Sequence, residues 1–386
     1  MAGEQQAEVR IGGDPHALWR AVSVLVTAAW TATFFLYYVA AFDRAAPGHD
    51  RSGTLVIAVP LAIVFWQLTA LVHEAGHLLG GLSRGWRPLV FVVRPIAYQV
   101  PARSIAWRWR EKTFGDARGW VGMVPSDPAR FAPRDFAVLV AGGPIASALL
   151  AAIAFLSART WLPALDDRGG LMPSFIAYGI ALQALYDLTF TLLPHTRKGA
   201  TSDGDKLRRL RRADDGFQPR LSFSFMALMA KEGVRSREIP QWMIDTARRF
   251  EPDNPDIAMA IDGIELSAVL DAEIVDTRLA RRLIDRFRAF HGDGEWIASA
   301  DAWCAAMLEN DLDRAWAVRW DGEISDGDRG FVLLVDAAIA AREGDGDATR
   351  ELLDAMDRAR RGRTPFRDCI FEDARKQVEA LLAPPA

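Results

Sequence analysis

Two histidines and a glutamate stand close together in the sequence, in the order His73-Glu74-Ala75-Gly76-His77. On an α-helix, residues four apart lie on the same face, about one turn from each other. Two imidazoles so placed can bind one zinc ion through one ring nitrogen each. Glu74 can then take a proton from water whose pKa zinc lowers to roughly 7. The spacing therefore predicts zinc-dependent hydrolysis, with His73 and His77 as ligands and Glu74 as general base.

The surroundings of this motif argue against a chance match on a solvated helix. The motif closes a run without charged side chains, residues 52–72, which is long enough to span a bilayer. Ionisable groups at membrane depth are costly and usually have a function. A surface cluster just beyond the end of the helix is the alternative, and we consider it the weaker interpretation.

A catalytic zinc ion normally has three protein ligands and one open position. No cysteine lies near the histidine pair in the sequence, so the third ligand is expected to be histidine, aspartate or glutamate. Asp203 is our first candidate. It comes just after the last long apolar run and is predicted to lie on the same side of the membrane as the histidine pair. Asp187, inside that run, and His195, at its exit, remain alternatives. A turn or a helix start without a metal is the competing interpretation of the sequence SDG at 202–204.

The motifs around these candidates resemble those of the site-2 protease family of intramembrane zinc metalloproteases. In that family the third ligand is the aspartate of Asn-x-x-Pro-x-x-x-Leu-Asp-Gly. The matching stretch here begins with TLLP at Thr191 and resumes with SDG at 202–204. The gap between the proline and the aspartate is four residues longer than in the family motif. The resemblance covers about residues 52–212 and implies that Asp203 is the third ligand of one zinc ion per chain. It also implies cleavage of a peptide bond in or near a transmembrane segment of a substrate protein.

A second family element, Gly-Pro-x-x-Asn, corresponds here to GPIAS at 143–147. Serine and threonine stand at the two positions where the family has asparagine. The resemblance implies substrate-positioning roles for Gly143, Pro144, Ser147 and Thr191. The small residues at 142–144 also predict close packing between membrane helices.

Four apolar stretches are long enough for a transmembrane helix of roughly 20 residues. They cover residues 21–42, 52–72, 136–158 and 169–194. The second is expected to continue as a helix to residue 82. Loop 82–135 holds ten Lys and Arg against four acidic residues, and segment 195–212 holds seven Lys and Arg. By the positive-inside rule, these two segments, both termini and the active-site face are cytosolic.

Loop 82–135 contains three β-prone runs, at residues 89–93, 96–100 and 119–124. Trp107 and Trp109 lie beside arginines, a mixture typical of the membrane–water interface. We therefore expect short strands at the membrane surface, with an ordinary amphipathic loop as the alternative.

Charge divides the chain into two parts. Residues 1–212 hold 23 Lys and Arg and 15 Asp and Glu, a net charge of +8. Because the whole chain carries −4, residues 213–386 carry −12. This asymmetry predicts a membrane-embedded metalloprotease domain at 1–212 and a cytosolic helical domain at 213–386. The predicted fold class is mainly α, with a polytopic bundle of about four transmembrane helices and a small β element ahead of the soluble domain.

The second domain has helical periodicity of its own, for example over residues 274–290. Residues 306–315 and 340–349 resemble each other at an offset of 34 residues, which is similar to the tetratricopeptide period. Cys304 and Cys369 predict neither a thiolate metal site nor a disulfide framework, and we expect both to be reduced.

Two functions from other classes remain as alternatives to an active protease. One is a catalytically silent membrane regulator that keeps the protease fold and acts through the soluble domain. The other is a metal transporter or sensor, which would need further ionisable residues along several helices, whereas this chain offers only Asp187. A zinc protease with glutamate as third ligand is disfavoured, because the last two apolar runs contain no glutamate. Expected partners are a membrane-protein substrate and a protein bound by the helical domain, and we expect no nucleic acid.

Overall fold

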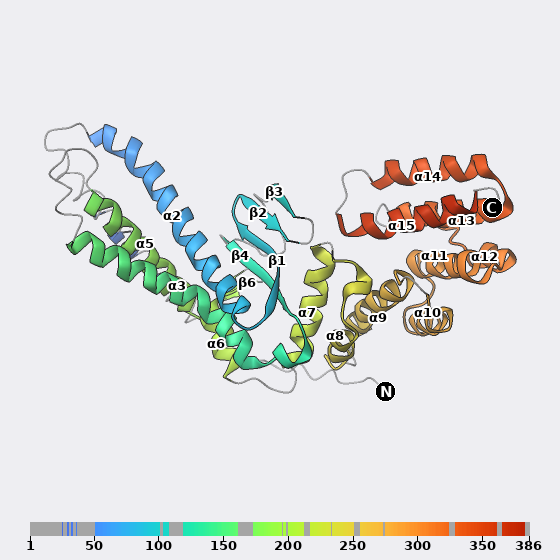
Figure 1. Cartoon of the computed structure of the whole chain (residues 1–386), viewed down its shortest axis with the longest axis horizontal. Coiled ribbons are helices and arrows are strands. Elements are labelled where there is room, and N and C mark those ends of the chain that lie inside the picture. The colour runs from blue at the N-terminus through green and yellow to red at the C-terminus, as the bar shows by residue number, and fades with distance from the viewer. Residues whose placement is uncertain are drawn as a thin grey trace, which may run out of the picture. The chain divides into compact units, whose positions relative to one another are not determined.

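The computed structural model divides the protein into two compact units, Met1–Ala213 and Asp214–Ala386 (Figure 1). This boundary is one residue from the division after residue 212 that separates the positively charged part of the chain from the negatively charged part. The described residues are 51–100, 103–107, 119–160, 173–194, 196–197, 200–211, 217–232, 234–250, 255–272, 275–323, 329–360 and 365–382, with a few between 25 and 36. The fold is mainly helical with a small antiparallel sheet, as expected.

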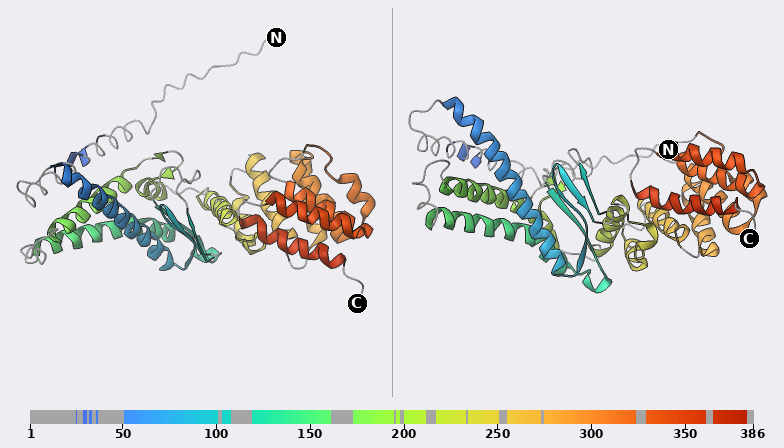
Figure 2. Two further views of the ribbon diagram at one scale, coloured as in Figure 1. Left: turned by 90° about the horizontal axis from the view of Figure 1, so that it is seen from above. Right: turned by 45° about the horizontal axis from the view of Figure 1, so that its top comes forward.

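Three long helices pack together in the first unit: α2 (Arg51–Leu82), α3 (Pro133–Thr160) and α5 (Pro173–Leu192) (Figures 1 and 2). Helix α2 runs on through the histidine motif to Leu82, which confirms that prediction. Among the described residues, α3 and α5 are the helices long and apolar enough to cross a membrane. The side chains of the first nine residues of α2 lie outside the described part, as does most of the expected span 21–42.

Helices α2 and α3 approach each other closely where two glycines meet. A Cβ atom on Gly76 would overlap the carbonyl oxygen of Gly142, and a Cβ on Gly142 would overlap that of Gly76. Small residues are what allow helix backbones to come this near in membrane proteins. The prediction of close packing at 142–144 is therefore confirmed, and the close contact involves a residue inside the histidine motif.

The loop after α2 forms a four-stranded antiparallel sheet in the order β3-β2-β1-β4. Its strands are β1 (Trp86–Val93), β2 (Ile96–Gln99), β3 (Ser104–Trp107) and β4 (Gly119–Pro125). The three β-prone runs correspond to β1, β2 and β4, whereas β3 was not predicted. On one face Val90, Val92 and Ala97 are buried with Trp120 against them. Strands β3 and β4 form the two edges of the sheet.

A hairpin and a short helix follow α5: β5 (Thr196–Arg197), β6 (Ala200–Thr201) and α6 (Asp203–Leu210). The segment between Pro194 and Asp203 thus contains a two-stranded hairpin. Ser202 is the N-cap of α6, and its side chain accepts a hydrogen bond from the backbone N–H of Asp205. Asp203 is consequently the first residue of a helix rather than a member of a free turn.

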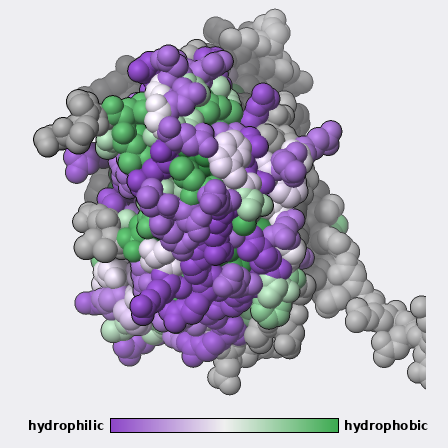
Figure 3. Space-filling view, turned by 90° about the vertical axis from the view of Figure 1, so that its right-hand side faces the viewer, coloured by the Kyte–Doolittle hydropathy of each residue, from purple (hydrophilic) through white to green (hydrophobic). Residues whose placement is uncertain are grey.

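The second unit is built of helices. Their bounds are α7 (Phe217–Lys231), η2 (Ser236–Glu238), α8 (Gln241–Ala247), α9 (Pro255–Leu270), α10 (Thr277–His291), α11 (Glu295–Trp303), η3 (Cys304–Glu309), α12 (Leu312–Val318), α13 (Arg329–Glu343), α14 (Gly346–Arg360) and α15 (Pro365–Leu381). Buried alanines, leucines and valines of α11 to α15, with Ile339, Trp303 and Met356, form its largest described core. Figure 3 looks onto this unit and shows hydrophilic residues over much of that face.

One predicted helix begins later than expected. The periodicity suggested residues 274–290, whereas α10 begins at Thr277. The reason is a cap: the Asp276 side chain accepts a hydrogen bond from the N–H of Leu279, which ends the non-helical segment before it.

The two segments that resemble each other at an offset of 34 residues lie at equivalent helix–turn–helix corners. Asn310 and Gly344 both have positive φ, of 55° and 83°. The next residue in each corner, Asp311 or Asp345, then caps the following helix through its carboxylate. The sequence similarity therefore reflects a repeated corner.

Candidate metal centre

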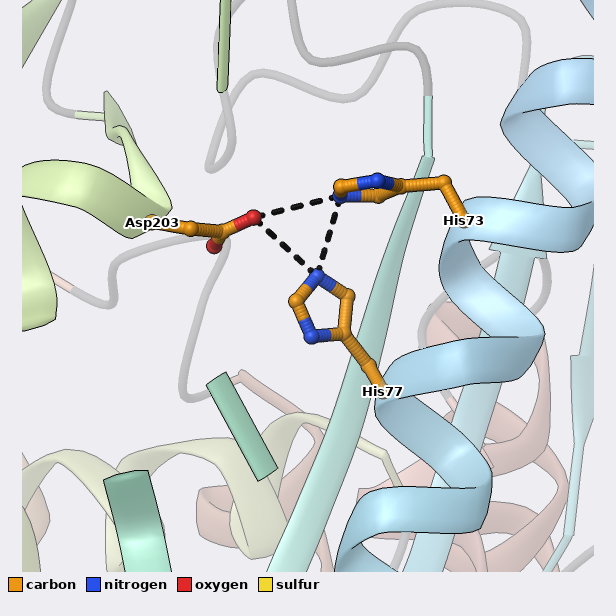
Figure 4. Close-up of side chains that lie close together, drawn as sticks. All are labelled: His73, His77 and Asp203. Carbon is orange, nitrogen blue, oxygen red and sulfur yellow. Dashed lines mark hydrogen bonds and ion pairs between the residues drawn. The ribbon is translucent and has the colours of Figure 1, made fainter. Parts of the chain in front are cut away.

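Three side chains from two distant parts of the chain converge in the first unit (Figure 4). His73 and His77 project from one face of α2, and their Nε2 atoms are 3.1 Å apart. Oδ2 of Asp203, at the start of α6, lies 3.1 Å from Nε2 of His73 and 3.3 Å from Nε2 of His77. All three side chains are buried. The structure thus brings together the three residues expected to be metal ligands.

The start of α6 is held against the end of α5, and this contact positions Asp203. The Ser202 hydroxyl donates a hydrogen bond of 2.7 Å to the carbonyl of Leu193. The backbone at Gly204 touches that of Leu192 so closely that a Cβ atom there would overlap it. Ser202 both caps α6 and ties it to the end of α5.

The three ligand atoms have a spacing suited to zinc. Atoms bound to zinc at about 2.0–2.1 Å in a tetrahedral arrangement would be about 3.3 Å apart. The observed separations of 3.1, 3.1 and 3.3 Å fit that geometry. Two imidazole nitrogens and one carboxylate oxygen are also a donor set that zinc accepts. The residues present therefore fit a zinc ion with three protein ligands.

The outer nitrogens of both histidines have partners that fix the rings. Nδ1 of His77 donates to the backbone carbonyl of Leu139, at 2.9 Å. Nδ1 of His73 lies 2.9 Å from the Ser147 hydroxyl, whose oxygen can accept a hydrogen bond from the Nδ1–H group. With a proton on each Nδ1, both Nε2 lone pairs face the centre, as a metal ligand requires. Sequence reasoning missed Leu139, since no sequence signal reveals a backbone carbonyl.

Gly143 leaves room at the place where a metal ion would lie. A Cβ atom at this position would be 2.7 Å from Nε2 of His73 and nearer still to Nε2 of His77. Any larger residue would therefore occupy the space between the ligand nitrogens. Pro144, the next residue, is buried within α3. Gly143 thus lies beside both histidines.

Glu74 is buried on α2 beside strand β4. A Cβ atom on Gly119, the first residue of β4, would be 2.9 Å from Oε1 of Glu74. The carboxylate of Glu74 thus borders the edge strand of the sheet, and Gly119 makes the space for it. The contact between Gly119 and Glu74 was not foreseen from the sequence.

The Asp203 carboxylate is held in its charged form. Burial by itself would raise the pKa of Asp203, but the Lys206 ammonium, the strongest opposing influence, and the neighbouring imidazoles outweigh it. These interactions hold the pKa of Asp203 well below its usual range. A charged carboxylate is the form that binds a metal ion.

The other candidates lie apart from this centre. Asp187 is buried between α2 and α5, where it accepts hydrogen bonds from Thr69 (2.5 Å) and Gln183 (3.1 Å). Asp187 is thus a buried, hydrogen-bonded residue of the helical bundle. The Thr191 hydroxyl donates to the carbonyl of Asp187 in its own helix. His195 lies outside the described residues.

Comparisons with models of protein families, with curated proteins and with solved structures find no match to this chain.

Changing Ser147 to alanine is expected to weaken zinc binding by roughly 10–100-fold, because the His73 ring loses the partner that fixes its orientation. Zinc affinity can be measured by competition with a chelator on detergent-purified protein. Ser147→Thr keeps the hydroxyl and should retain most of the affinity. Thr191→Ala, which removes a hydroxyl bonded within α5, serves as the matched control. Equal zinc affinities of Ser147→Ala and the unmodified protein would exclude this role.

Proposed function

We propose that this chain is an intramembrane zinc metalloprotease that hydrolyses a peptide bond in or near a transmembrane segment of a substrate protein. The convergence of His73, His77 and Asp203 is the observation that carries the proposal. Glu74, on the same helix as two of the ligands, adds a carboxylate able to accept a proton. The resemblance to site-2 proteases in the sequence motifs is consistent with this reaction.

His73, His77 and Asp203 would hold the zinc ion. Bound zinc would supply a Lewis acid that activates water and polarises a peptide carbonyl. Glu74 takes the proton of the attacking water and returns it to the leaving amine nitrogen as the peptide bond breaks. Ser147 and the Leu139 carbonyl keep the two imidazoles in the required tautomer and orientation. Each group thus has one task, and Glu74 carries the proton transfer.

A membrane location of the site is supported by the apolar surface of the helices around it. Helices α3 and α5 meet the length and composition needed to cross a membrane. Exposed apolar side chains cover outward positions of α2 and α3: Ile63, Val64, Leu71, Leu79, Ile145, Leu149, Ile153 and Leu156. Such surfaces suit lipid better than water. The histidine motif would then lie near the cytosolic end of a span formed by α2.

A helical substrate must unwind locally, because its backbone carbonyls are hydrogen-bonded and covered within a helix. Strand β4 is an edge strand that begins beside Glu74. An unwound segment can pair with such an edge through backbone hydrogen bonds. This geometry supports a substrate held in extended form next to the general base.

The proposed topology has four spans, with both termini and the active-site face in the cytosol. It follows from the excess of Lys and Arg in 82–135 and 195–212. Reporter fusions after residues 110 and 230 are expected to be cytosolic, and fusions after 48 and 165 external. An external signal at 110 or 230 would contradict the assignment.

The alternative is a catalytically silent regulator that keeps the fold and acts through a protein partner of its helical domain. One observation favours it: the Ser147 hydroxyl contacts His73 and the Thr191 hydroxyl contacts its own helix. Neither of these contacts takes up the substrate-binding role of an asparagine at those positions. A silent regulator would bind zinc without cleaving any membrane helix.

Removing zinc is the direct test of the proposed function. Purified full-length protein in proteoliposomes is expected to cleave transmembrane-helix substrates, and dialysis against a chelator should abolish cleavage. Adding back about one equivalent of Zn²⁺ should restore it, whereas Mg²⁺ should not, since it prefers oxygen ligands. Cleavage that survives complete removal of zinc would refute the proposal.

A further inference from the structure

Lys206 lies one turn after Asp203 on α6 and reaches back to it. Its Nζ is 3.2 Å from Oδ1 of Asp203. The other carboxylate oxygen, Oδ2, is the one 3.1 and 3.3 Å from the two histidine nitrogens. The two oxygens of one carboxylate therefore have different partners: an ammonium group on one side and the ligand nitrogens on the other.

Lys206 differs in exposure from the residues that it adjoins. Its side chain is 40% exposed, whereas that of Asp203 is 7% exposed. The spacing of three residues places both on one face of α6, which lets the lysine stem lie along the helix. The charged head of Lys206 thus contacts a buried carboxylate while part of the side chain stays accessible.

The consequence concerns how many bonds Asp203 can make to a metal ion. A carboxylate can bind a metal through one oxygen or through both. A catalytic zinc site needs one open position beside its three protein ligands. If Asp203 bound through both oxygens, the second would fill that position. An ammonium bonded to Oδ1 competes with the metal for that oxygen.

We propose that Lys206 is a positioning residue that keeps Asp203 bound through Oδ2 alone and so holds one coordination position open for water or substrate. The proposal rests on the proposed function, because it presupposes a metal at this site. Lys206 acts through Asp203 and is assigned no contact with the reacting atoms.

Cobalt(II) offers a test that does not depend on activity, since its visible absorption weakens as the coordination number rises above four. Detergent-purified full-length protein loaded with Co²⁺ is expected to show the strong bands of a four-coordinate site. In Lys206→Met, Oδ1 becomes free to bind, so the bands should weaken several-fold. Lys206→Arg keeps a cationic donor beside Oδ1 and should restore the unmodified spectrum.

Arg208→Met is the matched control. Arg208 lies on the same helix, has the same exposure of 40% and pairs with Asp205 at 2.6 Å. Asp205 keeps a second partner, Arg209, so this change removes one positive charge without affecting Asp203. The cobalt spectrum of Arg208→Met is expected to match that of the unmodified protein.

Three results would overturn the role of Lys206. The first is an unchanged spectrum in Lys206→Met, and the second is an equal loss of intensity in Arg208→Met. The third is a Lys206→Met protein that takes up no cobalt, because removal of the ammonium should free an oxygen for the metal. By contrast, an unmodified protein that binds neither Co²⁺ nor Zn²⁺ would refute the proposed function itself.

Discussion

Changing Glu74 to glutamine is expected to leave about one zinc ion per chain while cleavage falls by roughly 10²–10⁴-fold, the usual contribution of a general base. Glutamine has nearly the same size, and His73, His77 and Asp203 remain as ligands. The amide, however, cannot accept a proton from water. Metal content is measured by mass spectrometry and cleavage with a transmembrane-helix substrate, both on the same purified protein.

The matched control is Asp187→Asn, which makes the same carboxylate-to-amide change at another buried site of the helical bundle. Asparagine keeps one oxygen that can accept the hydrogen bond from Thr69 and loses the one that accepts from Gln183. Activity and zinc content should both persist, because Asp187 is outside the proposed ligand set. Full activity of Glu74→Gln would remove this residue from the reaction. Loss of zinc from Glu74→Gln would instead make it a ligand, which contradicts the assignment.

Changing Asp203 to alanine is expected to reduce bound zinc strongly, because it removes the charged oxygen of the proposed ligand set. His73→Ala or His77→Ala should empty the site, since each removes one of the two imidazole nitrogens that would bind the same zinc ion. Chelator competition on purified protein gives the change in affinity. Activity should fall with metal content, and excess Zn²⁺ should rescue Asp203→Ala better than either histidine variant.

Asp205→Asn tests whether this effect is specific to the ligand. Asp205 is two residues away on the same helix and is fully buried, but it pairs with Arg208 and Arg209. Its replacement should disturb α6 without taking a ligand from the metal. If Asp187→Asn lost zinc while Asp203→Ala kept it, the third ligand would lie within α5 and the assignment of Asp203 would be wrong.

Local patterns in the sequence were sufficient for most elements near the site. The spacing of His73 and His77 predicts a shared helix face, because helical periodicity depends only on neighbouring residues. The extent of α2 and α3 follows from long apolar runs, and β1, β2 and β4 follow from β-branched runs. Strand β3, at Ser104–Trp107, was not predicted, although it matches β2 in length and in its single β-branched residue. The late start of α10 depends on one side-chain cap, at Asp276.

The roles of individual polar residues could not be derived in the same way. Ser147 matched a motif position linked to substrate, whereas in the structure its hydroxyl contacts the ring of His73. Thr191 matched a similar position, yet its hydroxyl is bonded within α5. Hydroxyl groups can bond to their own backbone or to a neighbour, and the sequence does not distinguish these possibilities.

Local sequence patterns predict the histidine pair, the adjacent glutamate and the apolar helix that carries them, because all of these depend on residues within a few turns of one another. Which acidic residue lies beside the histidine pair depends on the tertiary structure, which places Asp203 there and Asp187 elsewhere. Asp203 is 130 residues from His73, and its approach depends on the packing of α3 and α5 and on the capped start of α6. The same packing directs Asp187 to Thr69 and leaves the carboxylate of Asp203 facing both histidines. Long-range packing depends on many weak contacts between distant parts of the chain, so it cannot be predicted from a short motif.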